Sequence, residues 1–257
     1  LSDYPLQERG GKTVFRYSEK GMAWYPSNTL GIQHIFPSGA IDLDSDPKLL
    51  KICHDTIDAL NRWADYNGFS SWYTACARVG YDPKTILEKM RIQCDKHMLP
   101  NLIMYYGGGG IENCGGMLAV NEMLLQSREM NAERGTRNAE SIEEENTEPK
   151  TDSALRVPRS AFLIRLFPCW PRDLDARFGN LRAVGAFLVS AEMKNGVVTG
   201  VKIVSEKGRD CKVQNPWPGK SVSVIRNGKS AESATGDRFV LKTTVNEAIA
   251  LEIAGHP

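Results

Sequence analysis

Several features that would assign this 257-residue chain to a common class of protein are missing. No apolar run approaches the ~18 residues that a transmembrane helix requires, so we expect no membrane span. Lys and Arg number 32 against 31 Asp and Glu, and the net charge of +1 is not concentrated in a basic stripe. We therefore expect no nucleic-acid partner. No signal peptide is visible at Leu1, which leaves open that a leader was removed or that the chain is a piece of a longer protein.

Metal-ligand patterns are also missing. The six cysteines form no CxxC pair and stand near no cluster of other ligands, so the sequence predicts no metal site. Cys53 and Cys76 have apolar neighbours and are expected to be small core residues. Cys114 follows a glycine run, but a catalytic thiol needs a histidine base, and no particular histidine is implied as its partner.

The first part of the chain has helical periodicity. In residues 40–127, apolar side chains recur at a spacing of three and four residues, which is typical of helices with one buried face. Asp46-Pro47 and Asp82-Pro83 each place a capping carboxylate before a proline at the first helical position. The last of these helices is expected over residues 117–127. We predict about four strong helices before the chain changes character.

A polar segment separates this helical part from a β-rich one. Residues 128–158, with the acidic run Glu140–Glu148, hold few apolar side chains to offset the entropy of ordering, so a mobile linker without chemistry is expected. Residues 159–257 contain short alternating apolar stretches between turn signals such as Asn195-Gly196 and Asn227-Gly228. This pattern predicts a small antiparallel β-sandwich.

The most informative segment is the run of four glycines at residues 107–110, which is followed by Ile111, Glu112 and Asn113. Glycines leave backbone amides bare and allow a ligand to approach closely. A carboxylate at a helix N-terminus beyond such a run is suited to activating water or binding a polar substrate. An ordinary glycine-rich turn with Glu112 or Asn113 as helix cap has the same pattern, so spacing alone leaves both interpretations open.

Several short tracts in order resemble the family 95 glycoside hydrolases, which include α-L-fucosidases and some α-L-galactosidases. The tracts are His34-Ile35-Phe36-Pro37, Gly68–Trp72 with Ala77–Gly80, Ile111-Glu112-Asn113, Glu122–Ser127, Ile164–Pro171 and Leu181–Val189. Each tract is short, and the resemblance depends on their order across about residues 22–215. It is closest to a divergent branch of the family.

The resemblance implies an α+β multidomain fold. The family's catalytic domain is an (α/α)6 toroid of twelve helices, followed by a β-sandwich. By this likeness, residues 1–127 are the C-terminal part of such a toroid, residues 128–158 an inserted linker, and residues 159–257 the antiparallel sandwich domain. Because a partial toroid would expose an apolar wall, either self-association or a missing N-terminal portion would cover it.

The resemblance also implies a reaction. Family members are inverting hydrolases, in which one carboxylic acid protonates the leaving oxygen and a second carboxylate activates water. Glu112 stands where the family has its general base, an aspartate, although the turn here is one residue shorter. The family's general acid lies upstream of the histidine tract, and this chain has no counterpart. We therefore expect hydrolysis of α-L-fucosyl or α-L-galactosyl linkages only in a complete parent protein.

Such chemistry acts on an oligosaccharide or polysaccharide and requires no metal or organic cofactor. The resemblance is compatible with a secreted or periplasmic bacterial parent, although the sequence itself does not give the compartment. We expect Asn113, His34, Trp24, Asn28 and Trp72 to be the substrate-binding residues. His34 falls at a histidine of the family's substrate pocket, and the aromatic rings would pack on sugar C–H groups. Ordinary core packing or capping stays an alternative for each of them.

Two other classes of function stay open. The chain is a carbohydrate-binding module that does not cleave its ligand, or it is a vestigial fragment without a ligand. A phosphorylase is a weaker enzymatic alternative, because a phosphate site needs Lys or Arg and none stands beside the glycine run.

Overall fold

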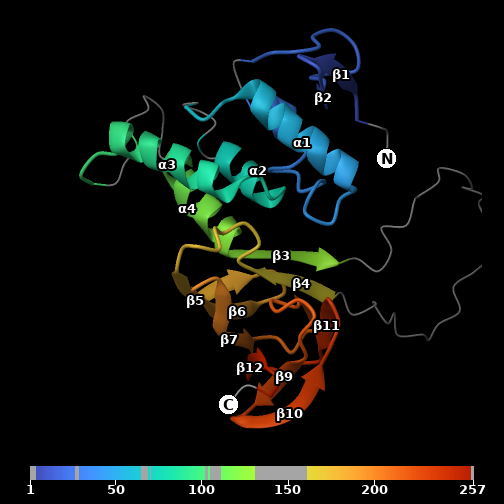
Figure 1. Ribbon diagram of the computed structural model, residues 1–257, viewed down its shortest axis with the longest axis vertical. Coiled ribbons are helices and arrows are strands. Elements are labelled where there is room, and N and C mark those ends of the chain that lie inside the picture. The colour runs from blue at the N-terminus through green and yellow to red at the C-terminus, as the bar shows by residue number, and fades with distance from the viewer. Residues whose placement is uncertain are drawn as a thin grey trace, which may run out of the picture.

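The computed structural model describes residues 4–26, 29–64, 69, 71–101, 104, 111–130 and 161–255. In this part of the chain, helices account for 24% of the residues and strands for 36%. The expected partial (α/α)6 toroid is therefore wrong, and the described fold is mostly β. Figure 1 shows the helices and a short N-terminal two-stranded hairpin at one end of the molecule and the remaining strands at the other.

The described helices are four and short: α1 (Pro47–Leu60), α2 (Trp72–Arg78), α3 (Pro83–His97) and α4 (Ile111–Leu124). Two of them begin at the predicted caps. The Asp46 carboxylate accepts a hydrogen bond from the Lys48 backbone N–H at 2.7 Å, and the Asp82 carboxylate accepts one from the Thr85 N–H at 2.8 Å. Each cap satisfies a backbone donor that the helix leaves unpaired, which explains why these boundaries are local properties of the sequence.

Before α1 the described chain forms no α-helix. Strands β1 (Leu6–Arg9) and β2 (Lys12–Phe15) make a two-stranded antiparallel hairpin, and a 3-10 turn over Leu30–Ile32 follows. The hairpin turns at Gly10 and Gly11, both of which have positive φ. A hairpin and a 3-10 turn contribute no helices to a toroid. This is one physical reason why the described fold differs from the expected partial toroid.

The end of α4 gives a second reason. The sequence predicts a helix through Ser127, but α4 ends at Leu124 and the chain passes directly into strand β3 (Leu125–Met130). Strand β3 pairs antiparallel with β4 (Ala161–Leu166) along its full length. This non-local pairing satisfies the backbone of residues 125–130 and buries Gln126, so it overrides the local helical pattern.

The remaining strands form two sheets. Four strands have the order β11-β8-β4-β3 and six have the order β10-β9-β12-β7-β6-β5, where β4 and β8 pair in parallel and all other neighbours pair antiparallel. The expected purely antiparallel arrangement thus contains one parallel pair. The bounds are β5 Ala176–Ala183, β6 Phe187–Lys194, β7 Val197–Ser205, β8 Cys211–Gln214, β9 Val222–Arg226, β10 Lys229–Ala234, β11 Arg238–Leu241 and β12 Glu247–Ile253.

Two hydrophobic cores hold these layers together. One lies between the two sheets and includes Ile164, Phe187 and Val213, and the other lies among the helices and includes Ile57 and Trp72. Val120 of α4 and Trp170, just beyond β4, pack against both cores. The continuous segment of α4 and β3 thus connects the helical layer to the sheets (Figure 1). No helix in the described ranges is long and apolar enough to cross a membrane.

Gly185, in the turn between β5 and β6, should tolerate no side chain. Its φ is +94°, and a Cβ there would lie 2.5 Å from the Phe162 Cγ and 2.7 Å from the Phe187 Cε2, both in buried rings. Overpacking of this kind typically costs about 2 kcal/mol. We expect Gly185→Ala to lower the free energy of unfolding by about 2 kcal/mol more than Gly200→Ala does.

Gly200 is the matched control, because its φ of +59° carries a similar backbone preference but a Cβ there meets open space. Urea denaturation of both variants measures the difference. Equal losses of stability would show that the two phenylalanine rings do not confine this turn.

Candidate functional site

The site expected from the sequence centres on the start of α4. Because α4 begins at Ile111, Glu112 and Asn113 lie in its first turn rather than in a turn that precedes the helix. The side chains of residues 111–115 and the glycine run at 107–110 lie outside the described part of the chain.

His34 lies in an aromatic contact rather than an open pocket. Its ring centroid is 4.0 Å from that of Phe15, at the end of β2, and 5.1 Å from that of Tyr4. Burial lowers the pKa of His34 to about 4, so its imidazole is neutral at pH 7. The buried Nε2 atom has no hydrogen-bond partner among the described residues. These contacts are those of a histidine packed in the core, which is the alternative to substrate binding.

The two tryptophans also pack within the fold. Trp72 is fully buried in the helical core, where its ring meets that of Trp63 edge-on at 5.6 Å. The guanidinium of Arg9 lies 4.5 Å over the ring of Trp24, which is half-buried. Trp72 therefore presents no face to a sugar, and one face of Trp24 is covered by Arg9. Asn28 lies outside the described residues.

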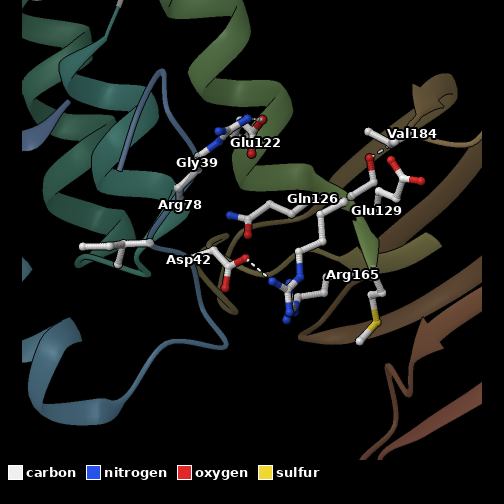
Figure 2. A pocket seen from close by; sticks show the side chains of 12 residues that line it. Gly39, Asp42, Arg78, Glu122, Gln126, Glu129, Arg165 and Val184 are labelled. Carbon is white, nitrogen blue, oxygen red and sulfur yellow. Dashed lines mark hydrogen bonds and ion pairs between the residues drawn. The ribbon is translucent and has the colours of Figure 1, made fainter. Parts of the chain in front are cut away.

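A cavity of about 450 Å³ lies at the opposite end of α4, where the helices meet the sheets (Figure 2). Eight of its twelve lining residues have charged or polar side chains. The residues that line it are Gly39, Ile41, Asp42, Arg78, Glu122, Gln126, Ser127, Arg128, Glu129, Met130, Arg165 and Val184. They come from the segment before α1, the end of α2, the end of α4, strands β3 and β4, and the turn after β5.

Arg78 is held in a fixed position on one wall of this cavity. Its Nη2 atom donates to the Glu122 carboxylate at 2.9 Å, and its guanidinium lies 5.0 Å over the ring of Phe36. Gln126 of β3 donates from its side-chain amide to the backbone carbonyl of Ala77 at 2.9 Å. These contacts join the ends of α2 and α4 to the first residues of β3.

The opposite wall is built around Asp44, which lies just outside the cavity lining. The guanidinium groups of Arg128, Arg165 and Arg238 all contact its carboxylate. Arg128 also pairs with Asp42 at 2.8 Å. Burial raises the pKa of Asp44, but the hydrogen bonds and charges of the arginines outweigh it and hold this pKa at about 2. The segment before α1 is thereby tied to strands β3, β4 and β11.

Comparisons with known proteins were made for the whole chain. No family model matches it. No curated protein matches it either. The functional interpretation therefore depends on this chain's own residues and on the resemblance of its short tracts.

The cavity was not foreseen from the sequence, although most of the tracts that carry the resemblance meet there. Arg78, Glu122, Arg165 and Val184 belong to four different tracts, and His34–Pro37 ends two residues before Gly39. The sequence shows the order of these tracts along the chain, but it does not show that they lie together around one cavity. Within the described residues, no group of three or more His, Cys, Asp or Glu side chains is placed to hold a metal ion.

Proposed function

We propose that this chain belongs to a carbohydrate-active protein related to the family 95 glycoside hydrolases. In the complete protein it would take part in hydrolysis of α-L-fucosyl or α-L-galactosyl linkages with inversion. The observation that carries this proposal is the position of Glu112 in the first turn of α4, directly after the run of four glycines. The proposal concerns the residues of this turn and not a toroidal fold, which the described helices do not form.

In this proposal Glu112 is the general base that removes a proton from the attacking water. A general base must be ionised at the working pH, and the positive end of α4 favours the ionised carboxylate. Asn113, the next residue, is proposed to contact the water or a sugar hydroxyl. The general acid would come from sequence outside this chain, because no tract here resembles the family's acid-bearing segment.

The test is stereochemical. The longer protein that contains this chain should release sugar from α-L-fucosides or α-L-galactosides, and proton NMR should detect the β-anomer of the released sugar first. Inversion places the water on the face opposite the leaving group, so early appearance of the α-anomer would exclude the proposed mechanism. Absence of hydrolysis across fucosides and galactosides would reject the enzymatic assignment.

Carbohydrate binding without cleavage is the second candidate function. The missing counterpart of the general acid favours it for this chain alone, because half of an acid–base pair cannot complete the hydrolysis. A glycan array that detects binding, combined with an assay that detects no release of reducing sugar, would identify this function.

A further inference from the structure

We propose that the cavity between the end of α4, strand β3 and the segment 39–42 is a second ligand site, which takes a neutral, hydroxyl-rich molecule of the size of a mono- or disaccharide. Its volume of about 450 Å³ lies within the range of about 300–1,000 Å³ that is usual for small-molecule sites. The proposal goes beyond the proposed hydrolysis, since a chain that never cleaves a glycoside would hold the same site.

The cavity is separate from the turn that carries Glu112. Glu112 and Glu122 lie ten residues apart on α4. With a rise of about 1.5 Å per residue, their Cα atoms are separated by about 15 Å along the helix. A sugar held beside Glu122 therefore does not contact the carboxylate proposed as the general base.

The charge of the cavity wall selects a neutral ligand. The lining holds three carboxylates and three guanidinium groups, so its formal charges cancel. The carboxylates belong to Asp42, Glu122 and Glu129, and the guanidinium groups to Arg78, Arg128 and Arg165. Asp44 and Arg238, behind this wall, also pair with each other. An anion would meet the unpaired Glu129 carboxylate, and the guanidinium groups that could attract it are already paired with carboxylates, whereas a neutral polyol meets no net repulsion.

Unused hydrogen-bonding groups match the hydroxyls of such a ligand. The Glu129 side chain is exposed on β3 and has no ion-pair or hydrogen-bond partner among the described residues. The Ser127 Oγ accepts a hydrogen bond from the Val184 backbone N–H at 2.9 Å, which leaves its own O–H to donate. Glu122 uses only one carboxylate oxygen on Arg78. Figure 2 shows Glu129 and Val184 on one side of the cavity, with Arg78 and Glu122 on the other.

The wall is also preorganised. Arg78 is held between Glu122 and the Phe36 ring, and Arg128 is held by two carboxylates. A ligand therefore pays little entropy to order these side chains. The side chains of Met130 and Val184 supply apolar surface at the same cavity, on which the C–H face of a sugar ring can pack.

The test is calorimetric titration of the full chain with L-fucose, D-galactose, D-glucose and lactose, with sodium sulfate and calcium chloride as charged probes. We expect at least one neutral sugar to bind and neither salt to bind. Glu129→Gln should weaken that binding about tenfold, because a hydrogen bond to a charged acceptor contributes about 1.5 kcal/mol. Val184→Trp should abolish it by filling the mouth, since Val184 is 46% exposed.

Glu252→Gln is the matched control, because Glu252 is an exposed glutamate on β12 and is not part of the cavity lining. It should leave the affinity unchanged. Absence of sugar binding, binding of sulfate or calcium in place of sugar, or sugar binding that both cavity variants leave intact would overturn the proposal. Hydrolysis of fucosides or galactosides is not part of this titration, and the cavity variants do not touch the turn that carries Glu112, so failure of the second site and failure of the proposed hydrolysis are distinguishable.

Discussion

Replacing Asp44 with asparagine should lower the free energy of unfolding by about 1–2 kcal/mol, because the buried guanidinium of Arg165 loses its anion, whereas the more exposed contacts with Arg128 and Arg238 contribute little. The Arg165 side chain is only 8% exposed, and it forms an ion pair with Asp44. Arg128 keeps Asp42 as a partner, but Arg238 and Arg165 lose their anion. Urea denaturation at pH 7 measures the loss. Asp237→Asn, at an exposed position beside Arg238, is the control and should change stability little.

The same variant has a defined pH dependence. The pKa of Asp44 in the folded chain is about 2, below its ordinary value of 3.8, so the folded state binds its proton less readily than the unfolded state does. Its contribution to stability is therefore complete above about pH 5 and is lost as the pH falls towards 2. The stability difference between the native chain and Asp44→Asn should shrink over this interval. A difference that stays constant down to pH 2 would show that the arginines do not depend on the ionised carboxylate.

If the proposed function holds, changing Glu112 to glutamine in a complete parent protein should lower turnover of an α-L-fucoside or α-L-galactoside by about 10³-fold, the usual contribution of a general base. Glutamine keeps the size of the side chain and its place in the first turn of α4, but it cannot accept a proton from water. The measurements are turnover under saturating substrate and the melting temperature. Turnover should fall while the melting temperature changes little.

Glu88→Gln is the matched control for this experiment. Glu88 is exposed on α3, and its side chain has no ion-pair or hydrogen-bond partner among the described residues, so the same change of chemistry there should leave turnover unaltered. Equal activity of Glu112→Gln and the native protein would remove Glu112 from the mechanism. Equal losses in both variants would indicate a general effect of lost negative charge instead.

Local signals in the sequence predict local structure well. Asp46 and Asp82 cap α1 and α3, because a carboxylate one position before a proline satisfies donors that belong to the helix itself. Asn195-Gly196 and Asn227-Gly228 make the predicted turns, and all four residues have the positive φ that these turns require. Each of these features depends on only a few neighbouring residues.

The pairing of strands that lie far apart in the sequence could not be predicted from such local signals. Leu125 continues the apolar pattern of α4, which predicts a helix through Ser127, but the pairing of residues 125–127 with β4 makes them a strand. The partner residues lie about forty positions further along the chain, so nothing in the local pattern indicates the pairing. The toroid was inferred from resemblance, and the hairpin of β1 and β2 occupies sequence for which that inference required helices.

In the candidate site, too, local signals are visible in the sequence and contacts between distant residues are not. Glu112 was selected from its neighbours, and the structure describes the helix that begins beside it. The aromatic candidates were selected by residue type, which does not distinguish a bare ring from a packed one. Trp72 proves to be fully buried, and Trp24 lies beneath Arg9.

The sequence by itself determined where α1 and α3 begin, where the Asn-Gly turns lie, and that a carboxylate follows the glycine run, because each of these depends on groups a few bonds apart. Only the tertiary structure decided that α4 passes into a strand and that arginines from three strands converge on Asp44. The cavity, too, is a feature that only the tertiary structure decided. Its wall exists only when side chains from distant segments come together, since both the pairing of charges and the exclusion of water depend on distance in space.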